Sequence, residues 1–153
     1  MSTGSSRTTA LDPSYFISLV ESLINSNMIR DEVCIRRVIS ALYFSLFNYW
    51  AARKYELERR RGKGRYQDRF AYRQFHEELL GRDLDRDVVL LYILRTASDH
   101  YVLNPTIIEI QNKEMIALLH RDKLEVRITA KALRNALNSS KAILRTIKSY
   151  PHP

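Results

Sequence analysis

The longest uncharged stretch of the chain, VISALYFSLFNYWAA, runs from residue 38 to residue 52. It contains no Gly or Pro, and its apolar positions do not alternate strictly, so it predicts a helix rather than a strand. Polar breaks occur only at Ser40, Ser45 and Asn48, so we expect this helix to be contacted on most sides. Because a bilayer span takes roughly 18 or more apolar residues, the stretch is predicted to be the central core helix of a helical domain.

The segments before and after this stretch extend the helical pattern. Asp12-Pro13 is typical of a helix start. Apolar residues then recur at helical spacing: Phe16, Leu19, Val20, Leu23 and Ile24. Asp31 is a suitable N-cap for the central helix. That helix is predicted to continue to about Arg60, where the glycines of RGKGR end it.

Three further helices are predicted in the rest of the chain. One covers about 68–80 and stops at Gly81, and the next covers about 87–100 and ends before Asn104-Pro105. The run VVLLYILR in the second of these is apolar all round, which predicts another buried helix. The last helix is predicted from an N-cap at Thr129 to about residue 149. Its a/d-type positions are Leu133, Leu137, Ser140, Leu144 and Ile147.

Residues 106–128 carry two conflicting patterns. TIIEI and KLEVRI alternate well enough for two short strands, whereas EMIALLH between them has helical spacing. A hairpin-like excursion and a short helix are both compatible with this segment. The predicted fold class is all-α, an antiparallel bundle of four to five helices with an irregular excursion around 106–128. It forms a single domain over 12–150, after a disordered N-terminus at 1–11.

Composition adds an electrostatic expectation. The 153 residues include 25 Lys and Arg against 17 Asp and Glu, a formal charge of +8, which favours an anionic partner and nucleic acid first. Cys34, the one cysteine, excludes an internal disulfide and is expected to be a small core residue. The N-terminal MSTGSSRTTA has no apolar stretch typical of a signal peptide. No membrane association is therefore expected, and the cytoplasm is the expected compartment.

The last helix carries a second, basic stripe. Lys131, Arg134, Lys141, Arg145 and Lys148 lie within roughly 100° of one another at 3.6 residues per turn. A solvated face usually mixes signs, yet no acidic residue occurs between Thr129 and Ser149. The stripe is therefore a candidate RNA-backbone contact, with an ordinary solvated face as the alternative.

A second basic cluster is the sequence RRRGKGR at 59–65. Its cations are Arg59, Arg60, Arg61, Lys63 and Arg65. The cluster is either a solvated loop or a phosphate-contacting loop whose binding depends strongly on salt. Tyr66 and Tyr72 could supply stacking surfaces beside it.

The sharpest candidate site is Arg95 with His100, in the string RTASDHY. Arg95 falls on an otherwise apolar helical face, so its charge requires a partner or an opening. Asp99, four residues on, could supply a purely structural ion pair. Arg95 and His100 are separated by about 140° on an ideal helix, so they converge only if the helix ends or kinks near Asp99. The four histidines show no metal-ligand spacing, and no metal or other cofactor is expected.

Two of these stretches together resemble the HEPN superfamily. In RVISALYFSLFNYWAARKYE, the family's signature positions are matched by Arg37, Ile39, Ser40, Tyr43, Phe44, Ser45 and Phe47. Ala41 stands where an Arg is common in the family. Arg95 and His100, with four residues between them, match the second signature of Arg, four to six residues, then His. The string LRTASDHYVL also resembles the family's Arg-x-x-Ala-Asp-Tyr variant. The likeness covers roughly 12–149.

The resemblance implies a small helical bundle, usually a homodimer. Many HEPN domains are metal-independent endoribonucleases of toxin–antitoxin and defence systems, often found beside a small nucleotidyltransferase. By resemblance, Arg95 and His100 of both subunits meet at the dimer interface. His100 then handles the proton of the RNA 2′-hydroxyl, and Arg95 stabilises the phosphate charge.

One position of the second signature departs from the active members. Thr96 stands where they carry Asn, Asp or His, and lineages with the Ala-Asp-Tyr variant are often non-catalytic. The resemblance therefore also implies an alternative, a binding module that docks a nucleotidyltransferase partner or a nucleotide.

Overall fold

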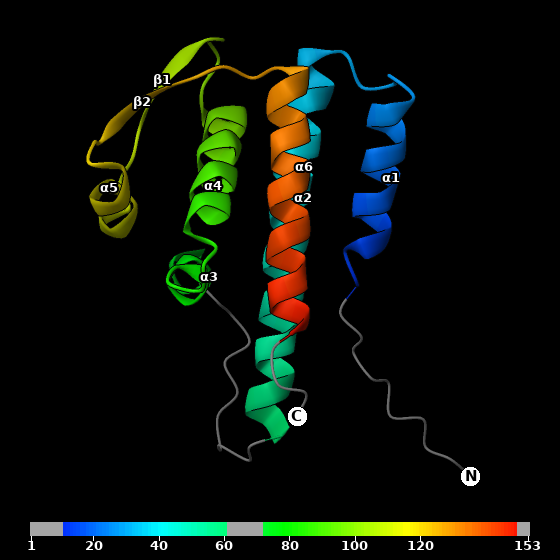
Figure 1. Cartoon of the computed structure of the whole chain (residues 1–153), viewed down its shortest axis with the longest axis vertical. Coiled ribbons are helices and arrows are strands. Elements are labelled where there is room, and N and C mark those ends of the chain that lie inside the picture. Colours follow the sequence, from blue (N-terminus) through cyan, green and yellow to red (C-terminus); the bar gives the residue numbers. More distant parts are fainter. Residues whose placement is uncertain (1–10, 61–71, 150–153) are drawn as a thin grey trace.

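The computed structural model describes residues 11–60 and 72–149, which form a helical bundle with one small hairpin (Figure 1). The elements along the chain are α1 (Ser14–Asn25), α2 (Glu32–Arg60), α3 (Tyr72–Leu79), α4 (Asp85–His100), β1 (Thr106–Glu109), α5 (Lys113–Leu119), β2 (Lys123–Val126) and α6 (Ala130–Lys148). The prediction of an all-α bundle is confirmed. The first residues of the helix predicted over 68–80, and almost all of the N-terminus predicted at 1–11, lie outside the described residues.

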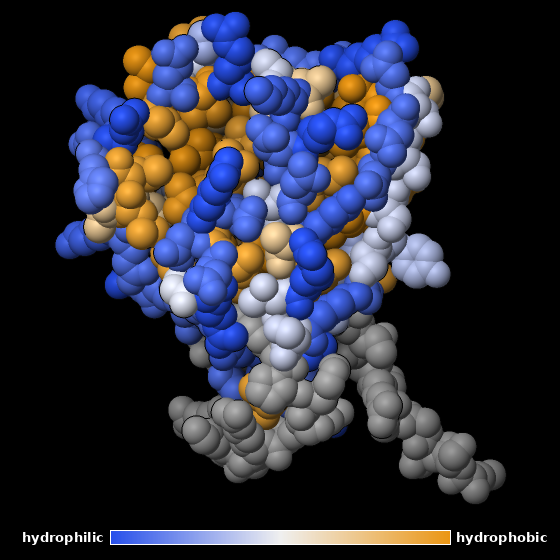
Figure 2. Space-filling view, viewed as in Figure 1, coloured by the Kyte–Doolittle hydropathy of each residue, from blue (hydrophilic) through white to orange (hydrophobic). Residues whose placement is uncertain are grey.

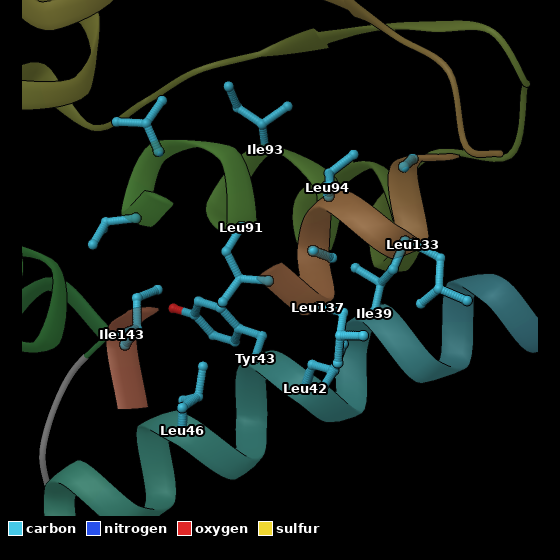
Figure 3. Close-up of a cluster of buried hydrophobic side chains, with 14 of the residues drawn as sticks. Ile39, Leu42, Tyr43, Leu46, Leu91, Ile93, Leu94, Leu133, Leu137 and Ile143 are labelled. Atoms are coloured by element: carbon cyan, nitrogen blue, oxygen red, sulfur yellow. The ribbon is translucent and has the colours of Figure 1, made fainter. Parts of the chain in front are cut away.

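Helices α2, α4 and α6 pack against one another and enclose the core. Figure 3 shows side chains from all three helices meeting around Tyr43 and Leu137, both at most 2% exposed. The uncharged stretch within α2 supplies Ile39, Leu42 and Leu46 to this cluster, which confirms α2 as the central core helix.

Helix α1 packs mainly along α6 (Figure 1). It buries Ile17 and Val20, whereas Tyr15 and Leu19 on its outer side are 90% and 54% exposed. The start of α1 follows the predicted chemistry, because the Asp12 carboxylate accepts a hydrogen bond from the Ser14 N–H (2.8 Å). The helix begins one residue later than Asp12-Pro13 suggests.

Both alternatives for residues 106–128 are realised together. Strands β1 and β2 pair antiparallel, with Ile108 opposite Leu124, and α5 lies in the connection between them. The strands pack on α4, with Ile108 and Val126 buried. Hydrophobic residues are visible at the upper left of Figure 2, where Figure 1 places α4 and the hairpin. The hairpin thus covers one side of α4.

The two predicted N-caps are present, but the predicted burial of Cys34 is not. Asp31 accepts from the Val33 N–H (2.7 Å), and Thr129 accepts from the Ala132 N–H (3.1 Å), so both N-caps are confirmed. The expectation that Cys34 lies in the core is wrong, since its side chain is exposed. Ile35, about 100° further round the helix, takes the buried position instead.

No helix in the described ranges has both the length and the apolar character needed to span a membrane.

Candidate functional site

Arg95 lies on the face of α4 that meets α2 and the start of α3, where three aromatic rings surround its guanidinium. The Arg95 Cζ atom is 5.0 Å from the ring centroid of Tyr43 and 5.2 Å from those of Phe44 and Tyr72. Cation–π attraction at these distances is stronger where water is excluded, and the Arg95 side chain is only 14% exposed. The three rings therefore fix the position of this cation.

Asp99 supplies the countercharge of Arg95. The Asp99 Oδ2 atom lies 3.0 Å from Arg95 Nε and also accepts a hydrogen bond from Ser40 Oγ (3.2 Å). The contact with Arg95 is an ion pair without a hydrogen bond, because the buried Nε has no hydrogen-bond partner. The structural ion pair considered from the sequence is thus present. The guanidinium donates no hydrogen bond to any residue in the described part of the chain.

A buried hydrogen bond lies beneath this site. The Tyr43 hydroxyl is 2.7 Å from His76 Nε2, and which of the two groups donates depends on the histidine tautomer. Burial first, and then the charge of Arg95, lower the pKa of His76 from its ordinary 6.5 to about 4. Burial also raises the pKa of Tyr43 far above its usual value. Both groups are therefore neutral at physiological pH and hold the Tyr43 ring against Arg95.

His100 does not join Arg95 within one chain. Helix α4 continues through His100 and ends at Tyr101, so the two side chains leave the helix about 140° apart. The His100 side chain is exposed. Any approach of His100 to an Arg95 guanidinium would have to involve a second subunit.

Arg36 is a residue of this region that the sequence patterns did not single out. Its Nη1 donates to the carbonyl oxygens of Ala97 (2.8 Å), Ser98 (3.3 Å) and Tyr101, and its Nη2 donates to that of Leu103 (3.3 Å). A cation here satisfies the free carbonyls at the end of α4 and opposes the negative end of the helix dipole. The sequence pattern did not distinguish Arg36 from its neighbour Arg37. The family pattern selects Arg37, whose side chain is exposed.

Two of the five cations in the basic stripe of α6 are paired with residues of α1 or just before it. Lys141 Nζ lies 2.6 Å from Glu21 Oε1, and Lys148 Nζ lies 2.8 Å from Asp12 Oδ2 and 2.7 Å from Ser14 Oγ. Partial burial alone would raise the pKa of Asp12, but hydrogen bonds from Lys148 and Ser14 lower it to about 2. The acids missing from α6 are therefore supplied by Glu21 of α1 and by Asp12 just before α1.

The remaining three cations of the stripe, Lys131, Arg134 and Arg145, are exposed. None of them forms an ion pair with a residue that the structure describes. They are the part of the stripe that remains available to an anionic partner.

Most of the second basic cluster lies outside the described residues. Arg59 is exposed near the end of α2, and Arg60 is the last residue of that helix. Arg61, Lys63, Arg65 and Tyr66 are not described. Tyr72 is described, and its ring belongs to the aromatic surroundings of Arg95.

Comparisons of the chain with protein-family models, curated proteins and solved structures gave no match. Within residues 11–60 and 72–149, no three His, Cys, Asp or Glu side chains gather closely enough to hold a metal ion.

Proposed function

We propose that the protein is an RNA-binding protein of the HEPN type in which Arg95 contacts a backbone phosphate. The observation that carries the proposal is the guanidinium itself, which is held against three aromatic rings and donates no hydrogen bond to a described residue. The two Nη groups of such an arginine form no hydrogen bond with a described residue, and a guanidinium is suited to bind a phosphate through two parallel hydrogen bonds.

Charge supports the same proposal. The chain carries a formal +8, and Lys131, Arg134 and Arg145 are exposed along α6. Such cations contact phosphates without reading the base sequence and draw RNA to the protein. Arg95 would then add a fixed phosphate contact to those of the exposed α6 cations.

The catalytic form of the proposal is a metal-independent endoribonuclease. The 2′-hydroxyl oxygen attacks the adjacent phosphorus, a P–O2′ bond forms, and the P–O5′ bond breaks. His100 takes the 2′-hydroxyl proton, a proton is returned to the leaving 5′-oxygen, and Arg95 stabilises the phosphate charge. Because the two side chains leave α4 in different directions, the pair would be assembled from the two subunits of a homodimer.

A second candidate is a non-catalytic binding module that docks a nucleotidyltransferase partner or a nucleotide. The ion pair of Arg95 with Asp99 (3.0 Å) favours it, because a cation already neutralised has less charge to offer a transition state. Thr96 favours it as well, since active members carry Asn, Asp or His at that position.

Binding of single-stranded RNA by matched variants tests the proposal. Removing Arg95 alone would leave the Asp99 carboxylate without its countercharge, so Arg95→Ala is made together with Asp99→Asn and compared with Asp99→Asn alone. We expect the double variant to bind RNA more weakly, while Arg86→Ala, an exposed arginine of the same helix, binds normally. Equal affinity of the double variant and Asp99→Asn would remove Arg95 from the binding surface.

Cleavage separates the two forms of the proposal. The catalytic form expects cleavage that continues in EDTA and leaves a 2′,3′-cyclic phosphate. It also expects His100→Ala to bind RNA normally but not cleave it, because a proton-transfer group acts in the transition state. RNA binding without cleavage by the wild type would contradict the catalytic form. Cleavage that survives His100→Ala would refute the role of His100.

A further inference from the structure

Within the described part of the chain, strand β2 has an unpaired outer edge. The Ile110 N–H donates to the Asp122 carbonyl (2.7 Å), so the pairs of Ile108 with Leu124 and of Thr106 with Val126 are the hydrogen-bonded ones. The residues between them, Lys123 and Glu125, therefore turn their backbone N–H and C=O groups away from β1. Neither Lys123 nor Glu125 forms a backbone hydrogen bond with another described residue.

The opposite edge of the sheet is partly occupied. The Glu109 N–H, which points away from β2, donates to the Tyr101 hydroxyl (2.9 Å). On β2, by contrast, none of the outward-pointing backbone groups of Lys123 and Glu125 bonds to a described residue, and an unpaired edge is a template for another strand.

The exposed charges of β2 are self-complementary. Lys123 and Glu125 lie on the same, exposed face of the strand. A two-fold antiparallel pairing centred on Leu124 places Lys123 of each copy directly opposite Glu125 of the other, and opposite charges at such positions attract. Centring the pairing on Lys123 or on Glu125 would instead place identical charges opposite each other.

The other face of β2 agrees with the same register. Leu124 points toward the core side but is only half-buried. In the pairing centred on Leu124, it would lie opposite Leu124 of the second copy in a non-hydrogen-bonded pair, where side chains are closest. One register therefore pairs the charges on one face and covers the apolar side chain on the other.

We propose that β2 binds a second copy of this chain edge to edge, which gives a four-stranded antiparallel sheet with the two bundles on the same face. A lysine on an edge strand usually discourages association. Here Glu125, two residues along, supplies the matching charge in the second copy. On the exposed face, the cross-strand order becomes Glu109, Lys123, then Glu125 and Ile107 of the second copy. This interface contains none of the proposed RNA-contacting residues, and it is a different contact from the Arg95–His100 interface that the catalytic form of the proposed function requires.

Disulfide trapping tests the register. In a Cys34→Ser background, Leu124→Cys should form a cross-linked dimer on mild oxidation. The two Cα atoms of a non-hydrogen-bonded pair are about 4.5 Å apart, and a disulfide spans about 4.4–6.8 Å. Ile107→Cys, exposed on β1 and one strand further from the two-fold axis, should not cross-link. Equal cross-linking of both variants, or of neither, would overturn the proposal.

Charge reversal gives an independent test that leaves Leu124 in place. Lys123→Glu and Glu125→Lys should each shift the protein toward monomer in light scattering at high micromolar concentration. The double variant Lys123→Glu/Glu125→Lys should restore the dimer, because the opposite charges again face each other. A wild type that is monomeric, or a dimer that neither single reversal weakens, would refute pairing through β2.

Discussion

Nη1 of Arg36 in the first turns of α2 lies 2.8 Å from the carbonyl oxygen of Ala97 in the last turn of α4. The same guanidinium also pairs with Glu32 (3.0 Å), and its side chain is only 13% exposed. It thereby joins the start of the central helix to the end of the helix that carries Arg95 and Asp99. The geometry of the candidate site depends on this junction.

Arg36→Ala is expected to destabilise the protein by about 2–3 kcal/mol, because hydrogen bonds to a charged group contribute about 1.5–3 kcal/mol and several carbonyls lose their donor together. The free energy of unfolding in urea measures the effect. Arg37→Ala is the matched control, since its exposed side chain should change that free energy by no more than about 0.5 kcal/mol. Equal effects of the two substitutions would show that Arg36 is not a structural cap.

His76 should make stability fall in mild acid. Its pKa is about 4 in the folded protein and 6.5 ordinarily, so between these values the unfolded state binds a proton that the folded state does not. The contribution is fully present above about pH 6.5 and is lost as the pH falls through about 4, a difference of about 3 kcal/mol.

Unfolding free energies at pH 7 and pH 5 check this expectation. His76→Gln, whose amide can still bond the Tyr43 hydroxyl but does not titrate, should reduce the difference between the two pH values. His100→Gln removes an exposed histidine and should leave it unchanged. If His76→Gln keeps the wild-type pH dependence, another group is responsible.

The exposed part of the α6 stripe gives a prediction on salt dependence. Arg134→Glu with Arg145→Glu should weaken binding to all single-stranded RNA sequences alike. It should also reduce the slope of log affinity against log salt by about 0.7 for each phosphate that the protein no longer neutralises. Lys113→Glu with Arg121→Glu changes the net charge equally at other exposed positions. Equal loss of affinity in both pairs would indicate a general charge effect rather than RNA binding along α6.

Asn104 should hold the hairpin to the start of α6. Its Nδ2 donates to the Ile128 carbonyl (2.8 Å), and its Oδ1 accepts from the Ile128 N–H (2.9 Å). Asn104→Ala removes both bonds and should cost about 1–3 kcal/mol, with faster amide exchange at Ile128. Asn138→Ala, an exposed asparagine of α6, should have little effect, and unchanged exchange at Ile128 in Asn104→Ala would contradict the role of Asn104.

Local signals in the sequence predicted the main helices. The uncharged stretch of α2 and the caps at Asp31 and Thr129 depend on neighbouring residues alone, and all three are confirmed. The segment 106–128 contained both of its patterns in full, and the structure uses both. What the periodicity could not supply was the place of that hairpin, against α4.

The candidate site was less predictable because its partners are distant in the sequence. Arg95 and Asp99 lie one helical turn apart, so their ion pair could be anticipated. The contact of Tyr43 with His76 joins residues 33 positions apart, and no spacing rule selects His76 over the other histidines. For the same reason, the acids that neutralise Lys141 and Lys148 were invisible from α6 alone.

The attachment of α1 to α6 also has a consequence for the order of events during synthesis. Glu21 and Lys141 are 120 residues apart, and Ser14 and Lys148 are 134 residues apart. At about 5–20 residues per second, many seconds separate the emergence of α1 from the ribosome and that of its partner. A 12-residue helix is marginal by itself in water, where about 12–15 residues are needed. Helix α1 is therefore expected to become stable only after α6 has left the ribosome.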